Sequence, residues 1–283
     1  MRDPLLPSRR ILFGAALGVG ACALALGRRA TAQPAFEWPG GARAAVSLTY
    51  DDGLNSQLDH AVPELDRRGF KATFFLTAEN VREGRRLAEW EQVARHGHEV
   101  ANHTVNHPCA LQRMQPERFE LGEIDAMESY LDANFGSARP RTYAYPCGYL
   151  GIGGGDRRER FARYRQILER DGVVAARTTT GAPNRPAEAV ADRFNLHAFE
   201  PTGEADITAP ARRYLTHAAS QGAWAILVFH DILPRWETEG DASIGVHRAI
   251  LQLVADSGFW VAPMGQVFEH LQAHHPAAGH TAR

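Results

Sequence analysis

Two adjacent carboxylates, Asp51 and Asp52, follow a short apolar run in the segment SLTYDDG. Carboxylates can accept a proton from water or bind a metal ion. Neighbouring side chains of an extended strand point to opposite faces, so both residues can serve one site only where the backbone bends. The pair therefore raises the question of whether the two residues have the same role or different roles.

Histidines at three further positions could complete a metal or acid–base site. His103 and His107 follow the apolar segment HEVAN, and His230 follows WAILVF. One carboxylate and two histidines suit a zinc-like ion that keeps a position open for water, and two histidines four residues apart can face the same way on a helical turn. The same spacing recurs at His270 and His274, so the spacing alone is a weak indication.

Short apolar segments alternate with helical patterns along the chain, and the chemically active residues lie where apolar segments end. The predicted strands are residues 44–49, 71–76, 98–102, 141–146, 172–177, 194–199, 224–229 and 259–263. Helices are predicted between them, over about 56–69, 86–96, 116–134, 156–170, 209–221 and 245–257. Such alternation is typical of βαβ units with a mostly parallel sheet.

Seven or eight β/α repeats in one domain predict an α/β fold of the (β/α) barrel type, with a doubly wound open sheet as the alternative. In a barrel the carboxyl ends of the strands meet at one face, which would bring Asp51, His103 and His230 together. Four more residues at or after strand ends would join them: Asp52, His107, Cys147 and Arg177.

The first 32 residues have the features of an export signal and are excluded from the fold. The arginine pair in SRRILF precedes an apolar run over residues 11–26, and ATA at 30–32 resembles a cleavage site. The run is short for a membrane span of about 20 residues. SRRILF resembles a twin-arginine signal, so we expect a periplasmic or extracellular protein with no stable membrane anchor after cleavage; an uncleaved anchor is the alternative. A single domain is then predicted over residues 33–273, with a disordered tail at 274–283.

The charge balance argues against nucleic acid as a partner. The whole chain has a formal net charge of −2, and removal of the signal leaves 26 basic and 32 acidic residues, or −6. No basic block remains to contact a phosphate backbone.

Three segments, in this order, resemble motifs of the polysaccharide deacetylase (NodB homology) family, also known as carbohydrate esterase family four. They are TYDDG at 49–53, HTVNH at 103–107 and LVFH at 227–230. The resemblance extends over roughly residues 38–270. It implies a distorted (β/α) barrel, one divalent metal ion, usually zinc, and the removal of acetyl groups from carbohydrate polymers. The ligand types alone would also accept cobalt, nickel or iron.

The resemblance implies separate roles for the residues at the strand ends. These are a general base, Asp51; three metal ligands, Asp52, His103 and His107; and a general acid, His230. One carboxylate would thus face the metal and the other the attacking water. His230 would also need a partner that tunes it, and the adjacent Asp231 is a candidate only if it points to the same side.

The sequence departs from the family pattern in its third and fourth motifs. Ala144 in TYAYPCG stands where the family usually has an arginine that stabilises the base, and Arg177 lies near the place of the missing fourth-motif aspartate. We hypothesise that Arg177 approaches Asp51 from the fifth strand and keeps it ionised; a surface arginine is the alternative. Pro146 has no N–H, so the oxyanion donor in YPCG would be the amide of Cys147 or of Gly148. The resemblance implies that it is the Cys147 amide.

Several residues near these motifs could support the site. Cys109 and Cys147 are the only cysteines outside the signal, and a disulfide between them or two free thiols are both open. The segment GYLGIGGG at 148–155 lacks the lysine–serine ending of nucleotide loops and is interpreted as a rim of the site. Tyr149 in this rim and Trp236 after His230 could stack on sugar rings or simply pack within their loops.

The expected function is that of an exported, metal-dependent deacetylase acting on an N- or O-acetylated polysaccharide. A hydrolase of small linear or cyclic amides on the same barrel is one alternative, because the altered third and fourth motifs leave room for another substrate. A non-catalytic carbohydrate-binding protein is a second alternative, and the intact candidate base, acid and metal ligands count against it.

Overall fold

The computed structural model describes residues 36–137, 141–201, 207–238 and 240–274. The signal predicted at 1–32 and the tail after His274 lie outside the described residues. The chain from Phe36 onward forms one unit. Among the helices that are described, none is long and apolar enough to cross a membrane.

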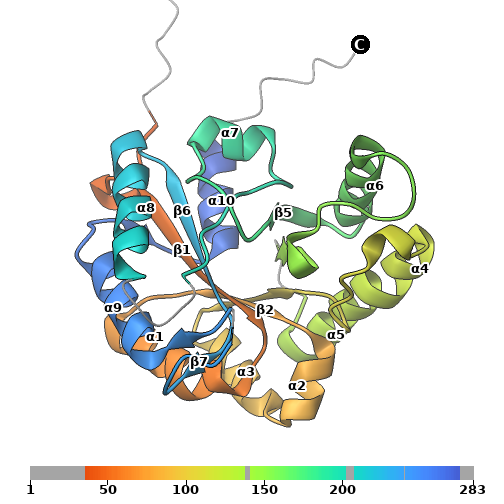
Figure 1. Cartoon of the computed structure of the whole chain (residues 1–283), viewed down its shortest axis with the longest axis horizontal. Helices are drawn as coiled ribbons and strands as arrows, with labels where there is room; N and C mark the ends of the chain where they lie inside the picture. The colour runs from red at the N-terminus through yellow and green to blue at the C-terminus, as the bar shows by residue number, and fades with distance from the viewer. Residues whose placement is uncertain (1–35, 138–140, 202–206, 239, 275–283) are drawn as a thin grey trace, which may run out of the picture. The chain divides into compact units, whose positions relative to one another are not determined.

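Parallel strands form the curved centre of this unit, in the order β5-β4-β3-β2-β1-β6 (Figure 1). Their bounds are β1 Ala45–Asp52, β2 Thr73–Leu76, β3 Glu99–Asn102, β4 Arg141–Ala144, β5 Val173–Arg177 and β6 Trp224–Phe229. The short β9, Trp260–Val261, pairs with the start of β1. A separate two-stranded pair consists of β7, Ile232–Leu233, and β8, Ala242–Ser243.

The segment 194–199, predicted as a strand, makes single bridges instead. Leu196 forms a parallel bridge with Arg177 of β5, and Phe199 forms one with Leu227 of β6. The segment therefore lies between the two edge strands and joins them. The predicted fold class, a distorted (β/α) barrel in a single domain, is confirmed, and the open doubly wound sheet is not found.

Helices connect the strands and surround the sheet (Figure 1). Their bounds are α1 Val62–Arg68, α2 Ala78–Gly84, α3 Leu87–Arg95, α4 Pro116–Phe119, α5 Ala126–Phe135, α6 Arg157–Arg170, α7 Pro186–Ala191, α8 Thr208–Gln221, α9 Ile244–Ala255 and α10 Met264–His274. Wider turns, η2 Gln57–Ala61 and η4 Glu120–Asp125, lead into α1 and α5. All six predicted helices are present; α2, α7 and α10 were not predicted.

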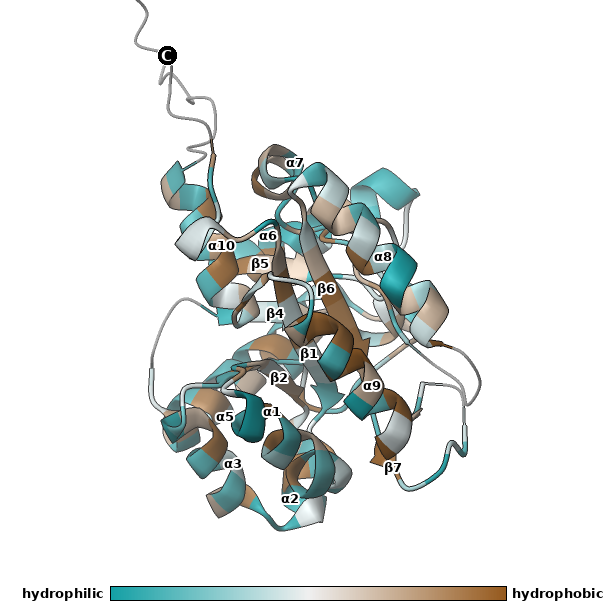
Figure 2. Cartoon of the chain, turned by 90° about the vertical axis from the view of Figure 1, so that its left-hand side faces the viewer, coloured by the Kyte–Doolittle hydropathy of each residue, from teal (hydrophilic) through white to brown (hydrophobic). Residues whose placement is uncertain are grey.

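Alternate residues of the strands pack on opposite sides of the sheet. Along β1, Val46, Leu48 and Tyr50 belong to the cluster beneath the surrounding helices, whereas Ala45 belongs to the cluster inside the barrel. Figure 2 shows apolar strands at the centre and hydrophilic residues on the helices around them. This burial of apolar surface is the main stabilising contribution to the fold.

Helix α10 closes the end of the barrel where the strands begin. The backbone amides of Met264 and Gly265 donate hydrogen bonds to Thr73 Oγ1 and Glu99 Oε2, which stand at the starts of β2 and β3. The apolar face of α10 is buried in the cluster inside the barrel. The polar strand ends therefore lie at the other end of the barrel, where (β/α) barrels carry their sites.

Candidate active site

The backbone bends at the end of β1, and this bend lets both carboxylates serve one site. Asp52 has a φ of 76°, in the left-handed region that residues other than glycine rarely adopt. Its carbonyl oxygen accepts hydrogen bonds from the Thr77 amide, from the Thr77 hydroxyl at 3.1 Å and from the Asn80 side-chain amide at 3.1 Å. These donors hold the unusual conformation in place.

Asp52, His103 and His107 bring one potential ligand atom each to within 4.8 Å of one another. Asp52 Oδ1 lies 3.6 Å from His103 Nε2 and 3.9 Å from His107 Nε2. His103 Nδ1 donates to the Ala144 carbonyl at 2.9 Å, whereas its Nε2 is buried and has no hydrogen-bond partner among the described residues. Burial also lowers the pKa of His103, against the opposing effect of Asp51 and Asp52, which favours the neutral form of the imidazole. An unpartnered ring nitrogen facing a carboxylate and a second imidazole fits a divalent metal ion.

A loop holds His103 and His107, so the helical turn considered from their spacing is wrong. Thr104 and His107 have φ values of 71° and 50°, and Thr104 Oγ1 accepts a hydrogen bond from the His107 amide at 2.9 Å. The Glu123 carboxylate accepts hydrogen bonds from the backbone amides of residues 105–106. Side-chain acceptors therefore shape this loop, and Glu123 is a supporting residue that the sequence analysis missed.

Asp51 and Arg177 form a buried ion pair. The side chains are 2% and 0% exposed, and Arg177 also donates from Nε to Thr49 Oγ1 at 3.2 Å and lies over the Phe75 ring. Arg177 is the register partner of Ala144 on the neighbouring strand. The contact hypothesised between Arg177 and Asp51 is therefore present, and the alternative of a surface arginine is wrong.

Opposing effects set the pKa of Asp51. Burial favours the neutral acid, whereas Arg177, His103 and His230 favour the carboxylate, and the pKa lies below its usual value. The nearest nitrogens of His103 and His230 lie 3.8 Å and 3.9 Å from Asp51 Oδ2. Asp51 is therefore ionised at neutral pH and able to accept a proton.

His230 is paired with Glu200, which the sequence analysis also missed. Its Nδ1 lies 2.8 Å from Glu200 Oε1. Burial alone would lower the pKa of His230, but Glu200 and Asp51 outweigh it and raise the pKa to about 9. Glu200 directly follows the segment 194–199, so the strand-end pattern that pointed to the other site residues could have indicated it.

Ser56 and Gln57, near the start of α1, form hydrogen bonds with residues at the ends of β1 and β6. Asp231, considered as the partner of His230, instead accepts a hydrogen bond from the Ser56 hydroxyl. The buried Gln57 side chain donates to the carbonyl oxygens of both Asp51 and His230. Gln57 thus fixes the end of β1 against the end of β6, and nothing in the local sequence had singled it out.

A disulfide joins Cys109 and Cys147, whose Cα atoms are 5.7 Å apart. This confirms the disulfide over the alternative of two free thiols. Cys109 Sγ lies 3.8 Å from His107 Nδ1, and Cys147 precedes Gly148 in the turn that follows β4. The bond therefore links the loop of a candidate metal ligand to the loop of the candidate oxyanion donor.

The two aromatic residues proposed for sugar contacts are both accessible. Tyr149 is 55% exposed and Trp236 is 38% exposed. Tyr149 lines a cavity together with Gly148, beside Cys147, whereas Trp236 follows β7. The two residues therefore lie on different loops.

Comparisons with known proteins agree with this arrangement. Residues 40–152 match a family model described as polysaccharide deacetylase. Over 67 residues the chain is 36% identical to a peptidoglycan-N-acetylglucosamine deacetylase from Bacillus cereus, an alignment that covers 23% of this chain and 24% of the relative. The curated relatives considered are matched over only 5% to 45% of their own length.

Solved structures share the fold at low sequence identity. A candidate polysaccharide deacetylase from Mycobacterium smegmatis has a TM-score of 0.61 and 19% identity, with 88% of this chain and 96% of that chain covered. A Bacillus anthracis protein described as a CE4 family pseudoenzyme has a TM-score of 0.54 and 15% identity, with 80% and 66% covered. Because the fold occurs in a pseudoenzyme as well, activity has to be argued from the residues of the site.

Proposed function

We propose that this member of the polysaccharide deacetylase family is an exported, metal-dependent hydrolase that removes N- or O-linked acetyl groups from a polysaccharide. The observation that carries the proposal is the buried His103 Nε2, which has no hydrogen-bond partner among the described residues and faces Asp52 and His107. These three residues would hold one divalent ion, with zinc expected from the family resemblance. When bound there, the ion would supply Lewis acidity for the acetyl carbonyl and would lower the pKa of a water molecule toward neutral pH.

Asp51 and His230 can divide the proton transfers of the reaction. Arg177 keeps Asp51 ionised, so Asp51 accepts the proton of the attacking water. His230, with its pKa raised to about 9, is protonated at neutral pH and donates to the leaving amine or alcohol. The Cys147 amide is the backbone donor toward the developing oxyanion.

Export is proposed from the twin-arginine pattern within residues 1–32. The Cys109–Cys147 disulfide supports a periplasmic or extracellular location, because disulfides persist in oxidising compartments. The proposed partner is an acetylated polysaccharide. Neither a nucleic acid nor a stable membrane anchor after signal cleavage is proposed.

Acetate release from a panel of acetylated glycans, with and without a chelator, tests this function. We expect the chelator to abolish release and added zinc to restore it. His103→Ala should lose bound metal in elemental analysis, whereas His270→Ala should keep it, because His270 contacts the Glu37 carbonyl outside the site.

Three outcomes would contradict the proposal in different ways. Release that persists after all metal has been removed would refute the metal role. Turnover confined to small linear or cyclic amides would favour the alternative hydrolase. Glycan binding without any turnover would indicate a carbohydrate-binding protein.

A further inference from the structure

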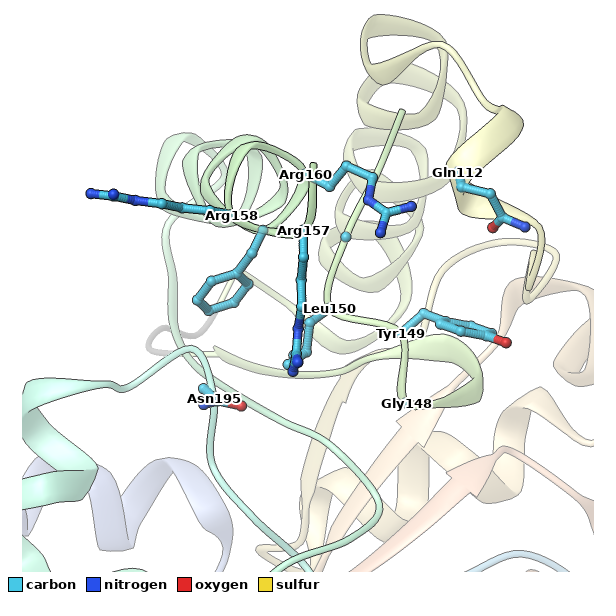
Figure 3. Close-up of a pocket in the computed structure, with 10 residues that line it drawn as sticks. Gln112, Gly148, Tyr149, Leu150, Arg157, Arg158, Arg160 and Asn195 are labelled. Carbon is cyan, nitrogen blue, oxygen red and sulfur yellow. The ribbon is translucent and has the colours of Figure 1, made fainter. Parts of the chain in front are cut away.

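A cavity of 810 Å³ lies beside the candidate catalytic centre (Figure 3). One wall consists of Gly148 and Tyr149, which directly follow the candidate oxyanion residue Cys147. The opposite wall is the first turn of α6, with Arg157 and Arg160. A volume of this size can hold a ligand larger than a single acetyl group.

The cavity wall carries positive charge that is not neutralised internally. Figure 3 shows Arg157 extending toward Leu150 and Asn195 and Arg160 extending toward Gln112. Neither arginine forms an ion pair with another residue of the part of the chain that the structure describes. The Nε of Arg160 is buried and has no hydrogen-bond partner there either. Both guanidinium groups are thus available to an anionic ligand.

The wall that carries Tyr149 is fixed against α6. The Ile152 amide donates to the Arg160 carbonyl at 3.3 Å, and the Arg163 guanidinium donates to the Ile152 carbonyl at 2.8 Å. A Cβ at Gly151 would lie 2.8 Å from Arg160 Cβ, so only glycine permits this close approach. The cavity is therefore largely formed before a ligand binds, which limits the entropy lost on binding.

We propose that this cavity binds a carboxylate-bearing sugar of the same polysaccharide whose acetyl group reaches the metal site. The substrate is then an anionic, uronate-containing acetylated glycan, and this inference rests on the proposed function. A guanidinium can bind a carboxylate through two parallel hydrogen bonds, and the exposed Tyr149 ring offers an apolar face to a sugar. Because the chain as a whole carries a net charge of −2, the positive cavity is a local feature.

Binding of oligosaccharides without acetyl groups tests the cavity independently of catalysis. We expect an oligogalacturonate to bind more tightly than a neutral chito-oligosaccharide of the same length in calorimetry, and its affinity to fall as salt is added. The double variant Arg157→Gln/Arg160→Gln should weaken oligogalacturonate binding about tenfold. The double variant Arg212→Gln/Arg213→Gln on α8 removes the same number of charges outside the cavity and should leave the affinity unchanged.

Turnover provides a second readout. With acetylated polygalacturonate, the double variant should raise KM about tenfold and keep kcat, because the arginines contact a part of the substrate remote from the reacting bond. Its rate on a small neutral acetate ester should match the unmodified protein, which controls for folding.

The outcomes separate this inference from the proposed function. Equal affinity for the neutral and the anionic oligosaccharide, or no loss in the double variant, would overturn the anionic-sugar site. If no substrate releases acetate but oligogalacturonate still binds through Arg157 and Arg160, the cavity assignment stands and the proposed function fails.

Discussion

Replacing Arg177 by glutamine would leave the buried Asp51 carboxylate without the main cation that compensates its burial. Two opposite charges about 4 Å apart attract each other by about 4 kcal/mol at an effective dielectric constant of about 20. Removing one partner of a buried ion pair typically costs about 3–5 kcal/mol. We therefore expect the free energy of unfolding at neutral pH to fall by about 3–5 kcal/mol in Arg177→Gln.

The loss of stability should depend on pH in a defined direction. Because the pKa of Asp51 in the folded protein is lowered, the pair stabilises the fold above the usual aspartate pKa, and this contribution disappears as pH falls through the folded-state pKa. The difference between the two proteins in urea unfolding should therefore be largest near neutral pH and shrink in acid. In the variant, burial without the arginine should raise the pKa of Asp51. The acid limb of the pH profile, where kcat/KM falls as Asp51 becomes protonated, should therefore move to higher pH.

Moving the arginine to β4 provides the matched control. Ala144 and Arg177 are register partners on adjacent strands, so Ala144→Arg/Arg177→Ala returns an arginine to the position that is usual in the family. The double variant should recover the acid limb and part of the stability, whereas Ala144→Arg alone should destabilise the protein by crowding a second cation into a buried position. If Arg177→Gln unfolds at the same urea concentration as the unmodified protein, or its acid limb does not move, Arg177 does not hold Asp51 ionised.

Two further variants test the partners of the site. Glu200→Gln removes the nearest carboxylate from His230, whose pKa of about 9 should fall, so the alkaline limb of kcat should move to lower pH; an unmoved limb would mean that Glu200 does not tune the acid. The pair of substitutions Cys109→Ser and Cys147→Ser opens a link across 38 positions and should cost about 2–4 kcal/mol of stability in urea unfolding without reductant. An unchanged urea midpoint would contradict a stabilising role for the disulfide.

The barrel and the main site residues could be predicted because both follow from local patterns. Apolar segments of strand length marked β1 to β6, and polar residues directly after them marked one end of the sheet. Asp51 and Asp52 end β1, His103 and His107 follow β3 in the next loop, and His230 directly follows β6. The fold then brings them together, because parallel strands end at the same face of a barrel.

The residues that were missed act through contacts between distant parts of the chain. Gln57 bridges β1 and β6, Glu123 shapes the loop of the candidate metal ligands, and Glu200 reaches His230 from the segment that closes the barrel. Gln57 and Glu123 have no distinctive local pattern of residue types, whereas Glu200 directly follows the strand-like segment 194–199 and could have been indicated by the strand-end pattern. Helix α10 was missed for a related reason: its role at the far end of the barrel depends on Thr73 and Glu99, which are remote in sequence.

The surroundings of Asp51 and Asp52 suit these two adjacent, chemically identical side chains to the different roles proposed for them. Asp51 is 2% exposed and held against Arg177, so its charge is balanced within the protein and it remains a proton acceptor. Asp52 is 20% exposed, and the positive φ at this residue turns its carboxylate toward His103 and His107. Two like charges can be neighbours in the sequence because each has its own source of compensation: Arg177 for Asp51 and the proposed cation for Asp52. Moving the arginine between strands preserves this division only if it still reaches Asp51, which is why the exchange between positions 144 and 177 is the most direct test of the site.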